Sequence, residues 1–441
     1  MKIKRLLSLS LTVFILCGSV KGQIVYNLKD CINTGLENNF SLLITRNSEE
    51  IAKNNFTPGN AGYLPSLDLS GRHSGTLNNI NQNLADGTQV ETNDVFNTTT
   101  NAGVNLGLTI FNGFNVQTTY KKLNELKQVG ELNTQMAIEN LVSDIVSAYY
   151  NYINQVQQLN NLKYALTLSR ERLRIDEERY LLGSSSKLNV LQSRVYLNSD
   201  SSRLSRQCET VRATEIRLNE LMAVVDLARS FVTKDSSIDI NPDFLYEKLL
   251  EETLTKNTSL LIARANKTIS EYDYKLIASR SYPYLNLSTG YNYYFYTYSG
   301  STTKNQLTNG MNYGLTMGLN IFDGWNQRRS LRNSSIEVMN KELKYQEVEQ
   351  GVRADLITIY SAYSSYLKLV ALEEQNLSTA TENLAIALER YRLGNLSGIE
   401  LREVQLSLLE ARESLVSVKY QAKLAEISLL LISGRIMEYY Q

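Results

Sequence analysis

Two acidic residues near the C-terminus, Glu400 and Glu403, form the most suggestive charged pair in this sequence. Their spacing of three places both side chains on one face of a helix. The single histidine, His73, lies between Arg72 and Ser74, and this stretch matches no nucleophile motif. The sequence also lacks phosphate loops, paired-cysteine metal motifs and dinucleotide fingerprints. We therefore expect no enzymatic activity, no cofactor and no metal.

The two glutamates follow the second copy of a duplicated motif. ERYLLGSSS begins at residue 178, and ERYRLGNLS begins 211 residues later, at residue 389. In each copy a glycine follows the leucine that ends a predicted helix, and serine or asparagine beyond it can cap the next helix. We interpret each copy as the tip of a helical hairpin. The tip residues are Arg179, Tyr180, Leu182 and Gly183 in the first copy and Arg390, Tyr391, Leu393 and Gly394 in the second.

The duplication extends over most of the chain. NAGVNLGLTIFNGFN at 101–115 matches NYGLTMGLNIFDGWN at 312–326, again 211 residues apart. Further upstream, residues 39–51 match 257–269 at an offset of 218, so the first copy contains the longer loop. In both copies a predicted strand passes into a helix through the sequence FNGF or FDGW. These strand–helix junctions contain Phe111 and Gly113 in the first copy and Phe322 and Gly324 in the second.

Each copy predicts the order helix, strand, strand, long helix, helix. The predicted helices are 28–56, 114–182, 187–224, 244–280, 326–393 and 397–432. The predicted strands are about 63–76, 97–111, 284–298 and 311–322, with exposed loops at 77–96 and 299–310. A long helix of this length spans roughly 100 Å. These lengths are typical of a tall cylinder and not of a compact globule.

The chain divides into five segments. Residues 1–22 have a basic start, an apolar core and a small-residue site before Gln23, as a secretory signal peptide does, although a short buried helix is the alternative. Cys17 lacks the preceding small residue that lipidation requires. The other segments are a first repeat at 23–224, a linker at 225–243, a second repeat at 244–432 and a tail at 433–441. We interpret Cys31 and Cys208 as free thiols or packing residues. A disulfide between these two cysteines is the alternative.

The strands carry a pattern that fits a membrane. Val104, Leu106 and Leu108 alternate with asparagine, glycine and threonine, and Leu315 and Leu319 do so in the second copy. An apolar face opposite a small polar face suits a barrel with lipid outside and water inside. The aromatic run at 291–299 fits an interfacial girdle, or alternatively an edge strand of a soluble sheet. Four strands are too few to close a barrel, so we expect an oligomer in lipid.

The charge of the whole chain is balanced, since Lys+Arg and Asp+Glu each number 45. This balance does not suggest a protein that binds nucleic acid.

The whole mature chain resembles the TolC family of outer-membrane export channels. The resemblance rests on the duplicated element order, the IFNGF and IFDGW junctions, the RYLLG and RYRLG tips and the signal segment. It implies a mainly α fold with a β-barrel part: a homotrimer in which each chain supplies four strands to a barrel in the outer membrane. It also implies a long periplasmic α-barrel, with the linker and the residues after 432 forming a belt around it.

The resemblance further implies a passive exit channel for drugs, small molecules or proteins. Such a channel works with a periplasmic adaptor protein and an inner-membrane pump of the RND or ABC type, and the tips dock the adaptor. Glu400 and Glu403 would line the periplasmic entrance as rings that attract cations, and mutual repulsion would raise their pKa so that conductance falls at low pH. The alternative for this pair is an ordinary solvated helix face, since Arg402 lies between them. The matching residues of the first copy, Asn189 and Gln192, are neutral, which puts in doubt an acidic latch found in some relatives.

Two other classes of protein remain to be compared. A non-channel structural or adhesive envelope protein with a long coiled-coil stalk would explain the helices, but it would leave the four patterned strands without a role. An envelope hydrolase is disfavoured by the missing catalytic motifs. The sequence does not identify the cargo.

Overall fold

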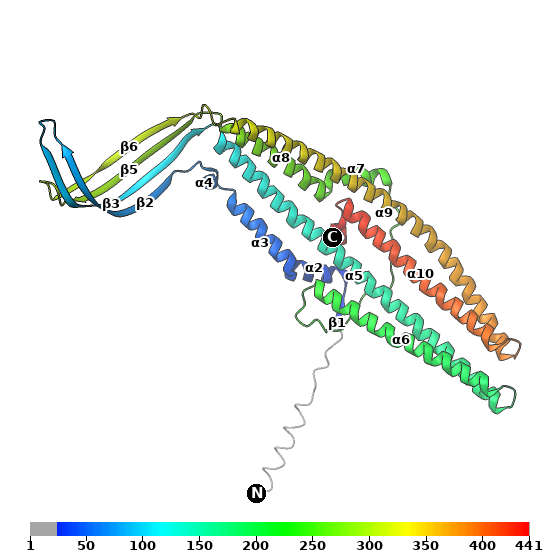
Figure 1. The fold of residues 1–441 in the computed structure, drawn as a ribbon. Coiled ribbons are helices and arrows are strands. Elements are labelled where there is room, and N and C mark those ends of the chain that lie inside the picture. The colour runs from blue at the N-terminus through cyan, green and yellow to red at the C-terminus, as the bar shows by residue number, and fades with distance from the viewer. Residues whose placement is uncertain (1–23, 441) are drawn as a thin grey trace, which may run out of the picture. The chain divides into compact units, whose positions relative to one another are not determined.

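The computed structural model describes residues 24–440 (Figure 1). The predicted signal segment, residues 1–22, lies outside the described residues. The chain forms two compact units. The first contains the residues up to Thr45, Thr134–Thr258 and those from Glu349 onward, and the second contains Arg46–Asn133 and Ser259–Val348. Each unit therefore combines segments of both sequence repeats.

The helices preserve the duplication in their lengths. Helices α5 (Asn115–Leu181) and α9 (Asn326–Arg392) both have 67 residues, and α6 (Lys187–Leu221) and α10 (Gly398–Ile432) both have 35. The shorter helices are α2 (Leu28–Asn38), α3 (Phe40–Asn55), α4 (Pro58–Ala61), α7 (Tyr246–Lys256), α8 (Thr258–Ser279) and the 3₁₀ helix η1 (Ile436–Tyr439). At 1.5 Å per residue, each long helix spans about 100 Å, as the sequence predicts.

Two predicted single helices are each broken by an asparagine. Residues 28–56 divide into α2 and α3 at Asn39, and residues 244–280 divide into α7 and α8 at Asn257. Asn39 Nδ2 donates to the carbonyl of Leu221 (3.0 Å), and Asn257 Nδ2 donates to the carbonyl of Ile432 (2.9 Å). These carbonyls belong to the last residues of α6 and α10, and no N–H donor within their own helices reaches them. The two breaks are thus equivalent, because in each the asparagine side chain donates a hydrogen bond to the last carbonyl of a neighbouring helix.

Replacing Asn257 by alanine should remove the bond to the Ile432 carbonyl and lower the free energy of unfolding by about 1–2 kcal/mol. Guanidinium unfolding of the detergent-solubilised protein, followed by circular dichroism, measures this change. Asn376→Ala is the matched control, because Asn376 is exposed and bonds only to Glu373 on its own helix (3.1 Å). Equal midpoints for the two variants would show that the bond contributes nothing.

The second unit contains an antiparallel sheet of four strands in the order β2-β3-β5-β6. The strands are β2 (Ser66–Asn83), β3 (Gln89–Asn112), β5 (Tyr284–Thr297) and β6 (Asn305–Gly318). The predicted loop at 77–96 is mostly paired instead, because β2 and β3 continue as a hairpin with a bulge between Asn78 and Ile80. This hairpin is rich in Asn, Gln, Asp and Thr, and its apolar residues, among them Leu77, Ile80 and Val90, follow no strict alternation that would reveal it. Strand β6 starts earlier than expected and ends before residues 319–322.

The two faces of the sheet differ as the alternation predicts. Asn105, Asn292 and Asn312 share one face, where Asn292 Nδ2 donates to Asn312 Oδ1 (2.8 Å) and Asn105 Oδ1 (3.4 Å). The neighbouring Gly103 leaves room for this row, since a Cβ there would lie 1.8 Å from Asn292 Oδ1. The apolar residues occupy the opposite face: Leu69, Val104, Leu106, Leu108, Tyr291, Tyr313 and Leu315. Leu319 lies beyond the end of β6, and the sheet therefore assigns it no face.

The first unit has its core where the linker meets the helices. Strand β1 (Ile24–Tyr26) pairs in parallel with β4 (Phe231–Thr233), which lies within the predicted linker. Phe231 is fully buried with Tyr149, and the hydroxyl of Tyr152 donates to the Phe231 carbonyl (3.1 Å). The linker is thus fixed by burial and by backbone pairing.

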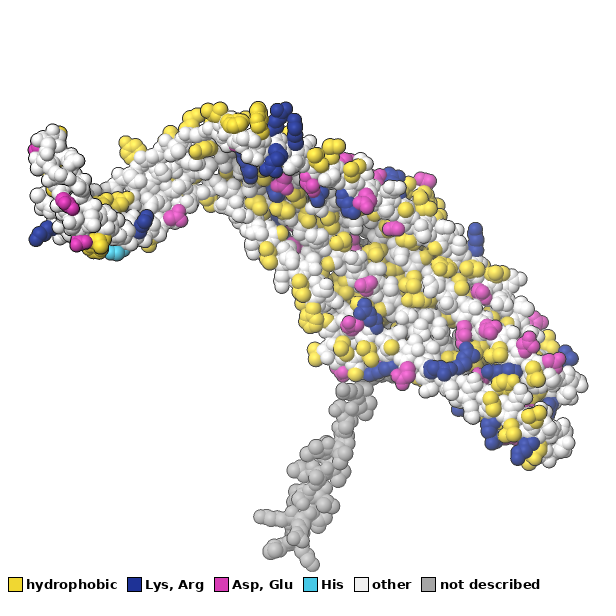
Figure 2. Space-filling model, viewed as in Figure 1, with side chains coloured by type: hydrophobic (Ala, Val, Ile, Leu, Met, Phe, Trp, Pro, Cys, Tyr) yellow, Lys and Arg dark blue, Asp and Glu magenta, His cyan; other side chains and the backbone are white. Residues whose placement is uncertain are grey.

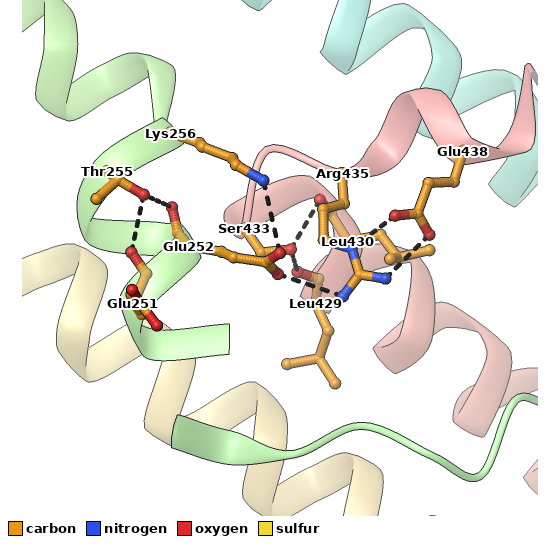
Figure 3. A network of polar contacts seen from close by, with 9 residues as sticks. All are labelled: Glu251, Glu252, Thr255, Lys256, Leu429, Leu430, Ser433, Arg435 and Glu438. Atoms are coloured by element: carbon orange, nitrogen blue, oxygen red, sulfur yellow. Dashed lines mark hydrogen bonds and ion pairs between the residues drawn. The ribbon is translucent and has the colours of Figure 1, made fainter. Parts of the chain in front are cut away.

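The segment after α10 folds back onto α7 (Figure 3). The Arg435 guanidinium donates to Glu438 on η1 (2.6 Å) and to Glu252 on α7 (3.3 Å). Ser433 Oγ donates to the Leu429 carbonyl (2.7 Å), and Ile436 is fully buried. The residues that the sequence marks as a tail therefore complete the first unit.

Candidate functional site

The two hairpin tips have the same backbone. Gly183 and Gly394 have φ of 74° and 82°, a left-handed conformation that glycine adopts without strain. In each tip the glycine N–H and the next N–H donate to carbonyls of the preceding turn, as in a Schellman motif. The helix that follows begins at Lys187 in the first tip and at Gly398 in the second.

Glu400 closes the N-terminus of α10. Its Oε2 accepts from the Ser397 N–H (2.8 Å), and its own N–H donates to Ser397 Oγ (3.2 Å). This capping box lowers the pKa of Glu400 through the backbone hydrogen bond from Ser397. The direction is opposite to the rise expected from repulsion between carboxylates. Glu403 is exposed one turn later, so both side chains remain on the surface of the chain.

Arg402, between the two glutamates, turns inward and joins the two hairpins. Its guanidinium makes two hydrogen bonds of 2.8 Å to the carboxylate of Asp200 on α6, which is almost fully buried. Asp200 also accepts from the hydroxyl of Ser169 on α5. Burial raises the pKa of Asp200, but the bonds from Arg402 and Ser169 outweigh it and leave this pKa below its ordinary value. The alternative interpretation of the sequence places Arg402 on a solvated helix face together with Glu400 and Glu403. The structure instead places Arg402 in a buried ion pair, so it is not part of such a face.

A second buried carboxylate lies nearer the tip. Asp176 on α5 accepts from the hydroxyls of Ser193 on α6 and Tyr391 on α9. Burial, followed by the bond to Asp176, raises the pKa of Tyr391 to about 12. The side chain of Tyr391 is only 3% exposed, and the Arg179 guanidinium stacks on its ring at 4.7 Å and donates to its carbonyl. Tyr391 and Arg179 thus connect the two hairpins, whereas the sequence suggests them as surface contacts.

The remaining tip residues are open to solvent. Leu182 and Leu393 are 83% and 75% exposed, and Tyr180 is exposed as well. Between the tips lies a cleft of about 550 Å³, lined by residues of both hairpins that include Arg179, Gly394 and Ser397. The other tip arginines, Arg390 and Arg392, are exposed. The tips therefore present apolar and basic side chains around a shared cleft.

The strand–helix junctions share an unusual backbone. Gly113 and Gly324 have φ of 66° and 68°, and the aromatic residues that follow, Phe114 and Trp325, also have positive φ, 66° and 67°. A bulky residue in this region costs roughly 1–2 kcal/mol relative to glycine. Phe111 contacts Phe114 edge to face (5.3 Å between ring centroids), and Phe322 contacts Trp325 in the same way (5.7 Å). Both copies thus hold an aromatic ring where glycine would be unstrained.

Chemistry-bearing residues elsewhere are dispersed. His73 lies on the apolar face of the sheet, with Nδ1 2.7 Å from Thr100 Oγ1. Within residues 24–440, no group of three or more His, Cys, Asp or Glu side chains could hold a metal ion. Cys31 is buried and Cys208 is exposed, and both are free thiols. Among the described helices, none is long and apolar enough to cross a membrane.

Comparison with known proteins identifies the family. The model of the outer membrane efflux protein family matches residues 31–224 and 249–435. The chain belongs to the outer membrane efflux protein family. Its members are outer-membrane channels and not enzymes, so this chain is an outer-membrane efflux channel protein and the expected absence of catalysis is confirmed.

Relatives of this efflux protein include two curated channels. The outer membrane protein TolC of Vibrio cholerae is 26% identical over 48% of this chain and 45% of the relative, so that match spans less than half of the relative. The cation efflux system protein CusC of Escherichia coli O157:H7 is 23% identical over 92% of this chain and 85% of the relative. A crystal structure of CusC superposes with a TM-score of 0.77 at 18% identity, covering 93% of both chains. These likenesses confirm the mainly helical fold with a sheet part.

The buried carboxylates are the residues that sequence reasoning misses. The signal lies in the comparison of the two repeats, where Asp176 and Asp200 occupy the positions of Ala387 and Ala411. All four side chains are buried. Each of these two buried positions therefore holds a carboxylate in the first copy and a methyl group in the second. A charged residue opposite alanine in an internal repeat is thus a usable indicator of a buried ionic contact.

Arg402→Met should destabilise the first unit by about 3–5 kcal/mol, because it leaves Asp200 buried and unpaired. The double variant Asp200→Ala/Arg402→Met should recover most of this loss, since it replaces the pair by apolar side chains, as alanine does in the other copy. A double-mutant cycle from denaturant unfolding measures the coupling. Additive losses would show that the two residues do not stabilise each other.

The same pair predicts acid sensitivity. Because the pKa of Asp200 is lowered in the folded chain, its contribution to stability is present above the ordinary carboxyl pKa of about 4 and is lost as pH falls through the folded value. Unfolding midpoints measured from neutral pH to about pH 3 should therefore fall more for the native chain than for the double variant. If the midpoints of the native chain and of the double variant fell equally with pH, the loss of stability in acid would come from other groups.

Proposed function

We propose that this protein is a passive exit channel that acts as a homotrimer and exports drugs, small molecules or proteins. It works with a periplasmic adaptor protein and an inner-membrane pump of the RND or ABC type, which supplies the energy. The observation that carries the proposal is the sheet: its two faces are chemically distinct, and within residues 24–440 its outer strands β2 and β6 each pair on one side only.

Apolar side chains on α9 support assembly with further copies. Ile336, Met339 and Leu343 are exposed and follow one another at spacings of three and four, which forms a stripe along one helix face. A stripe of this kind packs against a neighbouring helix in bundles and coiled coils. A second copy of the chain supplies the neighbour in the proposed trimer. Family membership disfavours the alternative of a non-channel adhesive stalk.

The tips are the proposed adaptor-docking surface. Leu182 and Leu393 are exposed apolar side chains, as in the centre of many protein interfaces, and Leu393 lines the cleft. Glu400 and Glu403, on the first turns of α10, are the proposed entrance residues, because both carboxylates are exposed. In a trimer, each would form a ring of like charge around the pore.

Lysine at Leu315 should impair membrane insertion, because this side chain is 63% exposed on the apolar face of β6 and would meet lipid. The cost near the middle of the bilayer is about 2–4 kcal/mol. Thr316→Lys is the matched control, since the neighbouring side chain lies on the opposite, polar face. Folding into vesicles, assayed by the heat-modifiable shift on gels, compares them. Equal impairment would contradict the assignment of the two faces.

Single-channel recording in planar bilayers tests the function directly. The native protein should conduct and prefer cations, and Glu400→Gln/Glu403→Gln should lose that preference while glutamine at 400 preserves the cap. Since the cap lowers the pKa of Glu400, this carboxylate should remain charged in mild acid, and the preference should persist there.

The control for this recording is Glu382→Gln/Glu410→Gln, which removes one exposed carboxylate from α9 and one from α10, both away from the tips. Absence of any conductance in the native protein would contradict the channel. Conductance with the same selectivity in both double variants would instead place Glu400 and Glu403 outside the pore.

A further inference from the structure

Four arginines gather at the second strand–helix junction. Arg328, Arg329 and Arg332 are exposed on the first turns of α9, and Arg280 is exposed just after α8. Spacings of three and four place the α9 arginines side by side. Figure 2 shows basic side chains beside hydrophobic ones over the start of α9. No carboxylate of the described residues forms an ion pair with any of the four.

Nearby acids are engaged by other partners. Glu342 pairs with Lys267 (2.5 Å), and Glu337 lies 3.5 Å from Lys341. Asp323 accepts from the Gln327 N–H (2.7 Å) at the start of α9. The backbone hydrogen bond does not neutralise Asp323, which lines the same cleft as Arg280 and Arg328. Four arginines beside this carboxylate still leave a net positive surface, which fits an anion from outside the chain.

Apolar and aromatic side chains adjoin the arginines. Trp325 and Phe322 are 65% and 69% exposed, and the exposed apolar series continues through Ile321 to Met317 on β6. The Arg328 guanidinium lies 5.8 Å from the Trp325 ring centroid. A cleft of about 600 Å³ between them is lined by Arg280, Trp325 and Arg328. Trp beside Arg at the end of a lipid-patterned strand is the composition of a membrane interface.

We propose that this surface, formed by Arg280, Trp325, Arg328, Arg329 and Arg332, binds the headgroup of an anionic phospholipid in the periplasmic leaflet. A phosphodiester monoanion accepts two parallel N–H bonds from a guanidinium, and the exposed Trp325 ring packs on the upper acyl chain. The outer-membrane location places lipid beside these strands. The proposal does not depend on what the channel exports.

The first repeat has no arginine at the matching positions. The residues matching Arg328, Arg329 and Arg332 are Gln117, Thr118 and Lys121, and Gly62 matches Arg280. The junction backbone is nevertheless the same, with positive φ at both Phe114 and Trp325. The arginines are thus not required to build the junction, and the headgroup site belongs to the second repeat.

Fluorescence of Trp325 reads out the site, because it is the single tryptophan of the chain. The full protein is reconstituted in phosphatidylcholine vesicles that contain a minor fraction of phosphatidylglycerol, with bromine on the acyl chains of one lipid at a time. Brominated phosphatidylglycerol should quench Trp325 more than its mole fraction predicts. Arg328→Gln/Arg332→Gln should lower this enrichment by roughly fivefold per arginine.

The control Lys344→Gln/Arg353→Gln removes the same charge from α9, at residues that pair with Glu347 and Glu349, and should keep the enrichment. Arg328→Lys/Arg332→Lys should retain part of it, since the charge remains without the guanidinium fork. Native mass spectrometry of all variants checks that assembly is unchanged.

Three results would overturn the proposal. Absence of quenching by either brominated lipid would place Trp325 outside the membrane interface. Loss of the enrichment in millimolar inorganic phosphate, but not in chloride of equal ionic strength, would identify a free-phosphate site. Loss of oligomers in Arg328→Gln/Arg332→Gln would assign the arginines to a neighbouring copy of the chain. None of these readouts requires conductance, so they are distinct from failure of the channel proposal.

Discussion

The outer edges of β2 and β6 carry backbone N–H and C=O groups that pair with nothing else in the described chain. In hydrocarbon each such group costs several kcal/mol if it stays unpaired, so a sheet in the outer membrane cannot end there. Further copies can satisfy both edges at once, because β6 of one chain can pair with β2 of the next. Oligomerisation is on this account a requirement of backbone hydrogen bonding, and the exposed stripe on α9 is consistent with it.

The two repeats share a backbone and differ in chemistry. The tips, the junctions and the asparagine breaks recur at matching positions, with closely similar φ at Gly183 and Gly394. By contrast, Asp200 replaces Ala411 and Arg328 replaces Gln117. Duplication therefore gives each chain two similar hairpins, and later substitutions give the two repeats different roles. The first repeat supplies the buried carboxylates that bond the two hairpins together. The second repeat supplies the proposed entrance and headgroup surfaces.

Much of the fold could be predicted because its signals are local. Glycines mark the ends of α5 and α9, and strict alternation marks the strand residues at 101–110. The breaks at Asn39 and Asn257 were not predicted, since each depends on a distant carbonyl that sequence periodicity does not contain. The hairpin within 77–96 was missed because its apolar residues are few and follow no strict alternation.

The site was less predictable than the fold. The sequence identifies the tips, but it does not show that Tyr391 is buried, because that depends on Asp176 from the other hairpin. The lowered pKa of Glu400 was missed as well, although Ser397-x-x-Glu400 is the sequence signature of a capping box. The role of Tyr391, in contrast, is set by a partner whose geometry appears only after folding.

Disulfide cross-linking of the two sheet edges tests the central claim most directly. Cys31 and Cys208 are replaced by alanine, one cysteine is placed at Ser70 on β2, and a second is placed in turn at Thr308, Gly310 or Asn312 on β6. Closed threefold pairing predicts one register that cross-links in the membrane and yields covalent species of up to three chains and no more. A ladder that continues past three chains, or the absence of interchain disulfides in every register, would contradict the account.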